Sequence, residues 1–379
     1  MSSSPELPDG ICAVVRALAE DPGQGIEKNV GIEPQFAPKL STLQAHDVVV
    51  AIRSAAVSWV DLLMTSGQYQ HIPTLPYTPG LEYAGRVAWK GADVSDERFR
   101  VGDKVYVACF TTGPRSSGPY QRYGGFASYA VAPADAVHPM PENFSFDQAC
   151  NFAGNFETAY HCLVDAGRLR AGETILIHGA SGATGLAAVQ IAKTLGARVI
   201  ATGRSSAKLE RVREHGADHV IALARPDGEP GIRRFRDQVK ELTGGRGADV
   251  VYDAVGGEIS LESLRCVKFG ARFLIVGWAS TPLVAKGKGG RGAPNANLLP
   301  TNLIMMKGLK VLGCPMVIST QNDPSIRPPR VAKLKEWAEA GKITPHVSHV
   351  FDLTDAKEAM LARWRGDVLG GCVVRPPSI

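Results

Sequence analysis

A glycine-rich turn between an apolar run and an amphipathic segment is the feature that most constrains this chain. The apolar residues 174–177 lead into the turn, the amphipathic segment 186–193 follows it, and a second apolar run covers 198–202. This order predicts a strand, a helix and a second strand. Small turn residues let backbone N–H groups approach phosphate oxygens, and the helix adds the positive end of its dipole. The alternative is a turn with a purely structural role. We expect a dinucleotide pyrophosphate to bind Gly179, Ser181, Gly182, Ala183, Thr184 and Gly185.

The polar segment after the second strand indicates which dinucleotide binds. A site for NAD places Asp or Glu about 20 residues after the glycines, where the carboxylate binds the ribose hydroxyls. Here cations and hydroxyls stand in that place, and such groups can donate hydrogen bonds to a 2′-phosphate. The candidates are Gly203, Arg204, Ser205 and Lys208. We therefore expect NADPH as the cofactor, and the alternative is a solvated polar turn ahead of the next helix.

The size and composition of the chain limit the classes of protein to which it can belong. Its 379 residues suffice for two domains, and the hydrophobic fraction of 44% and charged fraction of 21% are those of an ordinary globular protein. A net charge of +5 without a basic cluster argues against nucleic-acid binding. The first residues lack the features of a targeting peptide, and no apolar stretch is long enough to cross a membrane. The seven dispersed cysteines suit reduced thiols, so we expect a soluble cytoplasmic protein.

The order of the apolar runs predicts two domains in an α/β protein. Short β-like runs between Gly, Pro and Asp fill residues 12–150, which predicts a mostly β domain. Strand-like and helix-like patterns then alternate to about residue 316, and such alternation predicts a doubly wound parallel sheet. We expect one domain to comprise 1–155 and 320–379, and the other to comprise 156–319. The active site is then expected in the crevice between them.

Two segments have the composition of functional loops. Residues 112–125 and 286–294 both combine glycine with basic residues. One hypothesis is that each loop closes over the cofactor or over an anionic part of a substrate. The alternative is a solvated loop without such a role.

Several further motifs add to the glycine turn. They are Val57–Leu63, Ser66–Tyr69, Leu75–Gly85, Val101–Val105, Asp253–Gly257 and the pair Asn302–Leu303 ahead of Lys307. Together with the GxxGxxG turn, they resemble the medium-chain dehydrogenase/reductase superfamily, in particular its zinc-free quinone oxidoreductase and enoyl reductase branch. The resemblance covers nearly the whole chain. It implies a GroES-like catalytic domain and a Rossmann domain that binds NADP.

The resemblance also bears on metal binding. Zinc-dependent members hold a catalytic ion through cysteine and histidine, but the matching positions here are Ser58 and Leu81. The structural zinc lobe of the superfamily needs four closely spaced cysteines, and residues 109–126 contain one. We predict that the protein binds no metal, which disfavours alcohol oxidation because no Lewis acid lowers the pKa of the alcohol. Three histidines also lack metal-ligand spacing, and we expect polar or core positions for His71, His161 and His178.

Within this branch, the resemblance indicates Tyr69 as a proton donor. A tyrosine follows the corresponding Gly-x pair in enoyl-thioester reductases, and a phenol there can hydrogen-bond a substrate carbonyl. The alternative is that Tyr69 only packs on its loop. Those reductases carry asparagine where this chain has Ser58, which is left as a weaker candidate donor. Asp61 and Glu82 match positions that brace the cleft, and we expect a structural role for both.

Position and resemblance assign further residues to the cofactor. Gly277 and Trp278 follow a strand of the expected sheet, and together with Asn302 they are expected to approach the nicotinamide. In relatives, a tyrosine and an arginine after the third strand bind the 2′-phosphate. The match here is Leu223–Ala224, and Arg225, one position further on, is the candidate substitute.

We therefore expect a zinc-independent reductase that transfers hydride from NADPH to a quinone or an α,β-unsaturated carbonyl. An enoyl-CoA or enoyl-thioester reductase is the alternative among enzymes, with Arg115, Arg122 and the segment 286–291 as partners for substrate phosphates. A non-catalytic NADPH-binding protein, crystallin-like or redox-sensing, is the alternative from another class. The strand 309–314 is expected at a sheet edge, where relatives form homodimers.

Overall fold

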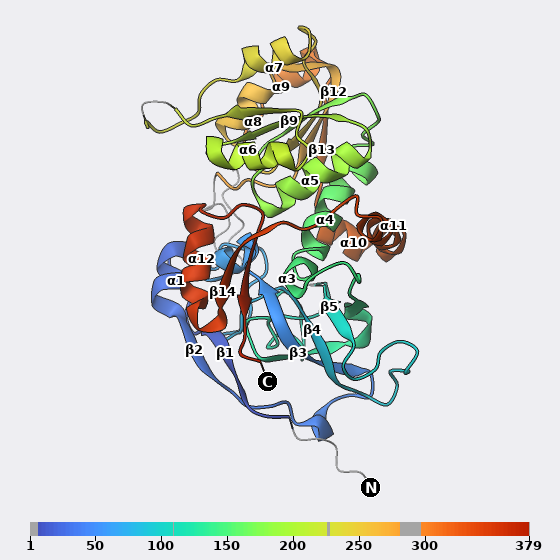
Figure 1. Ribbon diagram of the computed structural model, residues 1–379. Helices are drawn as coiled ribbons and strands as arrows, with labels where there is room; N and C mark the ends of the chain where they lie inside the picture. The colour runs from blue at the N-terminus through green and yellow to red at the C-terminus, as the bar shows by residue number, and fades with distance from the viewer. Residues whose placement is uncertain (1–6, 109, 226–227, 281–296, 379) are drawn as a thin grey trace. The chain divides into compact units, whose positions relative to one another are not determined.

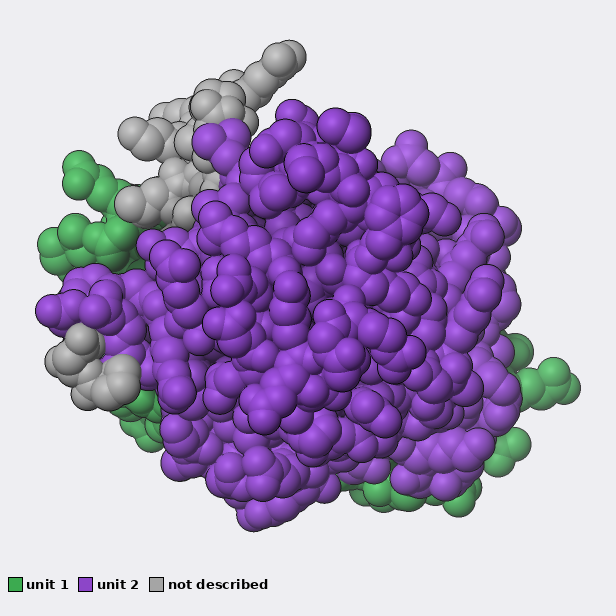
Figure 2. Space-filling view, turned by 90° about the horizontal axis from the view of Figure 1, so that it is seen from above, with its two compact units in different colours: residues 1–154, 285–291, 347–379 green, residues 155–284, 292–346 purple. Residues whose placement is uncertain are grey.

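The chain folds into two compact units (Figures 1 and 2). The computed structural model describes residues 7–108, 110–225, 228–280 and 297–378. The first unit comprises the described parts of 1–154 and 347–379, and the second comprises those of 155–284 and 292–346.

In the described part of the second unit, six parallel strands form a sheet in the order β10-β9-β8-β11-β12-β13. The chain starts in the middle with β8, proceeds outward to β10, and then continues from β11 to the other edge. This is the doubly wound order of a Rossmann sheet, so that prediction is confirmed. The strands are β8 (Thr174–Ile177), β9 (Arg198–Gly203), β10 (His219–Ala222), β11 (Ala248–Asp253), β12 (Val267–Ile275) and β13 (Lys310–Gly313).

Helices cover both faces of this sheet (Figure 1). Helices α5 and α6 contact β8, β9 and β10 on one face, while α7, α8 and α9 contribute apolar side chains to the core on the other. A π-helical turn at His161–Ala166 extends α4. The helices are α4 (Ala153–Tyr160), which begins in the first unit, α5 (Ala183–Thr194), α6 (Ser206–Glu214), α7 (Arg236–Leu242), α8 (Glu258–Ser263), α9 (Thr301–Met306), α10 (Met316–Asn322) and α11 (Arg327–Glu339).

The first unit is mostly β, as the sequence predicts. Strands β1 (Gly10–Val15) and β2 (Val30–Gln35) form an antiparallel pair. A larger sheet has the order β14-β15-β3-β4-β5-β7, with β6 also paired to β3. Its strands are β3 (Asp47–Ala56), β4 (Glu82–Lys90), β5 (Lys104–Val107), β6 (Tyr129–Pro133), β7 (Val137–Pro139), β14 (Val347–Asp352) and β15 (Gly371–Arg375). The helices are α1 (Pro22–Asn29), α2 (Trp59–Met64), α3 (Phe146–Ala149) and α12 (Ala356–Arg365).

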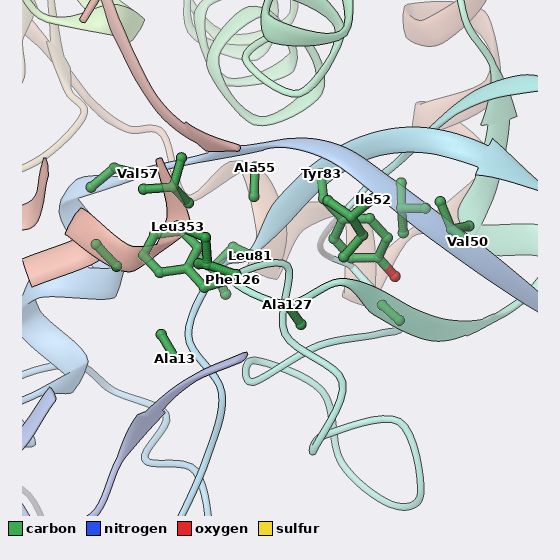
Figure 3. Close-up of a cluster of buried hydrophobic side chains, with 14 of the residues drawn as sticks. Ala13, Val50, Ile52, Ala55, Val57, Leu81, Tyr83, Phe126, Ala127 and Leu353 are labelled. Carbon is green, nitrogen blue, oxygen red and sulfur yellow. The ribbon is translucent and has the colours of Figure 1, made fainter. Parts of the chain in front are cut away.

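Strand β3 runs through the core of the first unit with both faces buried. Val50 and Ile52 belong to a cluster that also contains Tyr83 and Phe126 (Figure 3). The alternate residue Val49 belongs to a separate cluster, because successive side chains of a strand point to opposite faces. Burial on both faces explains why so many consecutive residues of β3 are apolar.

The structure differs from the expected domain boundary at residue 320. Helix α11 belongs to the second unit, where the buried guanidinium of Arg330 donates to Asp165 at 3.0 Å. Arg327 donates to the buried carboxylate of Glu157 at 3.0 Å. Because buried charges need partners, these ion pairs fix α11 to α4 and its π-helical turn. The chain returns to the first unit only at residue 347. None of the helices among the residues described has the length and apolar character needed to span a membrane.

Candidate active site

The glycine turn between β8 and α5 is built from backbone contacts that exclude larger residues. Gly179 has a φ of +65°, in the left-handed region that glycine adopts without strain. The N–H of Gly182 donates to the carbonyl of Gly179 at 2.9 Å, which closes the turn. A Cβ atom at Gly185 would lie 2.3 Å from that same carbonyl oxygen. The third glycine therefore allows the helix to approach the turn closely.

The N-terminus of α5 meets the conditions for binding a phosphate. Gly182 is the N-cap, and no side chain from the described parts of the chain caps the helix. The first backbone N–H groups, including those of Ala183 and Thr184, therefore have no intrahelical acceptor. The hydroxyl of Thr184 donates to Oδ1 of Asn155 at 2.9 Å. This bond fixes the Thr184 side chain to α4, so its contribution to a phosphate site comes from the backbone N–H.

The glycine turn lies beside the end of β9. The N–H of Ala180 donates to the carbonyl of Thr202 at 3.1 Å. The Oγ atom of Ser181 lies 3.7 Å from the position that a Cβ atom would take at Gly203. The structure therefore brings the predicted pyrophosphate and ribose segments together.

The segment after β9 combines an exposed cation with a helix cap. Arg204 is exposed. Ser205 is the N-cap of α6, and its Oγ atom accepts a hydrogen bond from the N–H of Lys208 at 3.3 Å. Ser205 therefore orders the start of α6 directly after Arg204.

A loop after β10 brings another arginine to the same strand ends. Arg225, the substitute considered from the sequence, pairs with Glu229 at 2.7 Å within its own loop. The N–H of Arg233 instead donates to the carbonyl of Leu223 at 2.8 Å, and the Leu223 N–H donates to the carbonyl of Gly203 at 2.8 Å. Arg233 is exposed. The sequence did not indicate Arg233, because backbone hydrogen bonds rather than local spacing return it to β10.

A buried carboxylate shapes the loop after β11. This strand lies beside β8, and the direction in which the chain adds strands to the sheet reverses between the two. Asp253 accepts hydrogen bonds from the N–H groups of Val255 and Gly256, each at 2.9 Å. A Cβ atom at Gly256 would lie 3.4 Å from Cα of Trp278, and the N–H of Gly277 donates to the Asp253 carbonyl at 3.3 Å. Gly277 and Trp278 therefore lie together with this loop at the carboxyl ends of β11 and β12.

The three residues predicted to approach the nicotinamide are not all joined by contacts. Trp278 is 47% exposed and lies beside the loop after β11. Asn302 lies in the first turn of α9 with an exposed side chain. Among the residues that the structure describes, no hydrogen bond joins Asn302 to Gly277 or Trp278.

The histidine ahead of the glycine turn is a core residue. His178 is fully buried, and its ring nitrogens lie 2.8 Å from Oγ1 of Thr202 and 2.7 Å from Oγ of Ser263. Burial lowers the pKa of His178 to about 4, so the ring is uncharged at neutral pH. The core position predicted for His178 is confirmed, and the ring ties β8 to β9 and α8.

In the first unit, Ser58 forms a capping box at the start of α2. Its Oγ atom accepts a hydrogen bond from the N–H of Asp61 at 3.2 Å. The N–H and the hydroxyl of Ser58 both donate to Oδ2 of Asp61, at 2.8 and 2.6 Å. The hydroxyl proton is therefore engaged by a carboxylate. This geometry gives Ser58 the role of a helix cap and argues against it as a proton donor.

Two buried carboxylates brace neighbouring loops of the first unit. The Oδ1 atom of Asp61 accepts the N–H of Gly80 at 2.9 Å, where a φ of +100° favours glycine. The Oε1 atom of Glu82 accepts the N–H of Gly154 at 2.6 Å. Burial raises the pKa of Asp61 above its usual range. The structural roles expected for Asp61 and Glu82 are confirmed.

Tyr69 has a polar partner that the sequence did not indicate. Its side chain is half-buried against the core of the first unit. Nη2 of Arg115 donates a hydrogen bond to the phenol oxygen, and the guanidinium carbon lies 5.2 Å from the ring centre. Burial lowers the pKa of Arg115 to about 10, an effect that the Asp61 carboxylate opposes, so Arg115 is a cation at neutral pH. Tyr69 therefore does more than pack on its loop.

The loop 112–125 is fixed to the first unit by hydrogen bonds. Gln121 accepts the N–H of Thr74 at 3.0 Å and donates to the carbonyl of Ser116 at 2.7 Å. These bonds argue against an unstructured solvated loop. The other segment with this composition, 286–294, lies outside the described residues.

The positions that hold zinc in metal-dependent relatives do not suit the ion here. The hydroxyl of Ser58 is bound to Asp61, and Leu81 is a buried apolar residue. Zinc prefers thiolate and imidazole ligands, and neither position offers one. In the described ranges, no group of three or more His, Cys, Asp or Glu side chains gathers in a way that could hold a metal ion. The donor set at these positions therefore does not fit zinc.

Two protein families match the chain. The alcohol dehydrogenase GroES-like domain matches residues 44–142, and the family described as zinc-binding dehydrogenase matches residues 183–327. The quinone oxidoreductase-like protein 2 homolog of Nematostella vectensis is 31% identical over 334 residues, which cover 88% of this chain and 82% of the relative. The chain belongs to the quinone oxidoreductase branch of the medium-chain dehydrogenase/reductase superfamily. It is therefore an oxidoreductase, and the resemblance seen in its motifs is confirmed.

Solved structures of this superfamily share the fold. A probable oxidoreductase from Mycobacterium abscessus is 26% identical, with a TM-score of 0.77 over 97% of this chain and 99% of that chain. The quinone oxidoreductase of Escherichia coli, solved in complex with NADPH, is 24% identical, with a TM-score of 0.75 over 97% of this chain and 100% of that chain. These similarities confirm the α/β fold with a GroES-like domain and a Rossmann domain.

Proposed function

We propose that this oxidoreductase is a zinc-independent, NADPH-dependent reductase of quinones or other α,β-unsaturated carbonyl compounds. The observation that carries the proposal is the pairing of Tyr69 with Arg115 in a unit whose zinc-ligand positions are Ser58 and Leu81. A zinc enzyme stabilises charge on the substrate oxygen with the metal ion. Here a phenol held by a cation is available for that task.

The second unit provides the proposed cofactor site. Its uncapped helix N-terminus and the close backbone approach at Gly185 fit a pyrophosphate, and the exposed Arg204 and Arg233 fit a 2′-phosphate. The NADPH bound in the Escherichia coli relative supports the same cofactor here. The pyrophosphate would contact Gly179, Ser181, Gly182, Ala183, Thr184 and Gly185, the ribose phosphate would contact Gly203, Arg204, Ser205, Lys208 and Arg233, and the nicotinamide would lie near Gly277, Trp278 and Asn302.

The residues of the first unit would manage charge on the acceptor. When bound, NADPH supplies a hydride to the electron-poor carbon of the acceptor. Negative charge then develops on the carbonyl oxygen, and the phenol of Tyr69 would hydrogen-bond that oxygen and give it a proton. Ser58 takes no part, because its hydroxyl proton is bound to Asp61.

The acceptor class follows from the relatives and from Arg115. Relatives named quinone oxidoreductases support a quinone acceptor. The alternative, an enoyl-CoA thioester, needs cations for the phosphates of CoA, and Arg115 is engaged with Tyr69 instead. Arg122 is exposed and is the remaining candidate partner for a CoA phosphate in this loop. The assay below therefore includes enoyl-CoA thioesters. A non-catalytic NADPH-binding protein is the remaining alternative.

The test is NADPH oxidation by the purified, metal-stripped protein with 1,4-quinones, simple enones and enoyl-CoA thioesters side by side. We expect turnover without zinc, with a quinone or enone as the fastest acceptor. Preference for the thioester would instead support the enoyl reductase. NADPH binding without turnover of any acceptor would support the non-catalytic alternative.

We also propose that the chain forms a homodimer through the edge of the second unit's sheet. Strand β13 is the last strand on its side of the described sheet, and edge strands attract partners. Phe269, Met305 and Met306 are exposed nearby, with Phe269 in contact with Gly308 just ahead of β13. Light scattering of the protein and of a Met305→Lys variant tests this, with a monomeric wild-type protein as the contradicting result.

A further inference from the structure

We propose that Arg115 is a positioning residue for Tyr69. Its guanidinium holds the phenol oxygen, so that the phenol hydrogen is free for the substrate oxygen, and it stabilises the charge left on the phenol when the proton leaves. This inference rests on the proposed function, because it assigns a partner to the proposed proton donor.

The hydrogen-bond chemistry of the pair sets the direction of the phenol hydrogen. A guanidinium can only donate hydrogen bonds, so the phenol oxygen must accept the bond from Arg115. The one hydrogen of the phenol is then available to a different acceptor. The guanidinium also stacks on the Tyr69 ring at 5.2 Å, which restricts the orientation of the ring.

The surroundings hold the guanidinium in place. Arg115 lies in a turn that the N–H and the hydroxyl of Ser116 close, with bonds to the carbonyl of Gly113 at 2.9 and 2.8 Å. Asp61 supplies a nearby negative charge, and its own position is fixed by hydrogen bonds from Ser58 and Gly80. The turn at Ser116 therefore orders the backbone of Arg115, and the Asp61 carboxylate of the α2 cap stabilises its positive charge.

The proton transfer needs only the acceptor, Tyr69 and water, together with the hydride of the proposed reaction. As hydride adds to the acceptor carbon, the π-electron pair moves to the carbonyl oxygen. A bond forms between that oxygen and the phenol hydrogen, and the O–H bond of Tyr69 breaks with its electron pair left on the phenol oxygen. The Arg115 cation faces that oxygen, which lowers the cost of the charge. Water then returns a proton to Tyr69.

The same loop contains a matched pair without this role. Arg122 donates to the phenol oxygen of Tyr123 at 2.8 Å, and its guanidinium carbon lies 4.8 Å from the ring centre. Arg122 is exposed. An Arg122 variant therefore controls for loss of an arginine–tyrosine contact in this loop.

The experiment compares Arg115→Met and Arg115→Lys, each alone and combined with Tyr69→Phe, with Arg122→Met as the control. Turnover of NADPH with a 1,4-quinone gives kcat and KM, and NADPH fluorescence gives the dissociation constant. We expect Arg115→Met to lower kcat about 10-fold or more, by analogy with loss of a group that stabilises developing charge. We expect unchanged NADPH affinity, partial recovery in Arg115→Lys or with added guanidinium ion, and no further loss in the Tyr69→Phe background.

Three results would overturn the inference while leaving the proposed function intact. They are an unchanged kcat in Arg115→Met, an equal loss in the Tyr69→Phe background, or an equal loss in Arg122→Met. Arg115→Met is replaced if it fails to fold, as judged by its melting temperature and NADPH affinity. Arg115→Lys is then compared with and without Tyr69→Phe, and an equal loss of kcat in both backgrounds overturns the inference. A wild-type protein that oxidises no NADPH with any acceptor would instead overturn the proposed function, and this inference with it.

Discussion

Arg204 and Arg233 place two exposed cations at the carboxyl ends of adjacent strands. Arg204 follows β9 directly, and Arg233 is hydrogen-bonded through its backbone to the residue that follows β10. A charge-assisted hydrogen bond contributes about 1.5–3 kcal/mol. We predict that Arg204→Ala or Arg233→Ala weakens NADPH binding about 10-fold or more and leaves NADH binding unchanged.

Fluorescence titrations with both dinucleotides measure this selectivity. Arg225→Ala is the matched control, because Arg225 already pairs with Glu229 in its own loop. If NADH binding weakens as much as NADPH binding, the arginines do not recognise the 2′-phosphate.

His178 gives the stability of the protein a defined pH dependence. Its pKa is about 4 in the folded chain and about 6.5 in an unfolded one, so between these values only the unfolded state binds the proton. Stability from this group is complete above pH 6.5 and falls as the pH drops toward 4, by about 3 kcal/mol in all. We predict that the wild-type free energy of unfolding falls by about 2 kcal/mol between pH 7 and pH 5 through this residue.

Urea unfolding of the wild type and a His178→Gln variant at both pH values isolates this contribution. The variant lacks the titrating ring, so its stability should change less between the two pH values. His215 and His346 also have lowered pKa values. Both proteins contain these residues, so their contributions to the change in unfolding free energy cancel in the comparison. Parallel pH profiles for the two proteins would contradict the assignment.

The junction between the glycine turn and α5 leaves less room at Gly185 than at Gly182. A Cβ atom at Gly185 would lie 2.3 Å from the Gly179 carbonyl oxygen, whereas one at Gly182 would lie 3.3 Å from it. Gly182 has a φ of −76°, which any residue can adopt. We predict that Gly185→Ala destabilises the protein by about 1–3 kcal/mol and weakens NADPH binding.

The matched Gly182→Ala variant should lower the free energy of unfolding much less. Chemical unfolding of both variants and NADPH titration measure the difference. Equal losses in the two variants would show that the close contact at Gly185 does not govern the turn.

Local patterns predicted the strands and helices around this turn, because a strand with both faces buried and an amphipathic helix leave distinct marks in a sequence. They did not predict the partner of Tyr69, since Arg115 lies 46 positions away in a loop whose path depends on the fold. Arg233 escaped notice for the same reason. The cap at Ser58 and Asp61 does have a local mark in the sequence, a serine followed three residues later by an acid.

The domain boundary expected near residue 320 could not be corrected from the sequence alone. Helix α11 belongs to the second unit, where its arginines pair with Glu157 and Asp165 and Trp337 contacts the ring of Tyr160. Those partners lie more than a hundred positions earlier in the chain. Domain membership here follows contacts between distant parts of the chain, and no local change in composition marks it.

The proposed zinc independence predicts how the whole protein responds to metal removal. Neither Ser58 nor Leu81 can ligate zinc, so dialysis against a strong chelator should leave turnover with a quinone unchanged within about two-fold. Elemental analysis before and after dialysis provides the control. Activity that is lost on dialysis and restored by zinc alone would contradict this prediction.

The return of the chain to its first unit has a consequence during synthesis on the ribosome. Strand β15 pairs with β3 and β14, so the larger sheet of the first unit lacks two strands until residues 347–375 have been made. The second unit is complete at residue 346. The part that is made first therefore finishes folding last. While it waits, the end of β3 at Ala55 and Ala56, which β6 leaves unpaired, is the place where a nascent chain would most readily pair with the wrong partner.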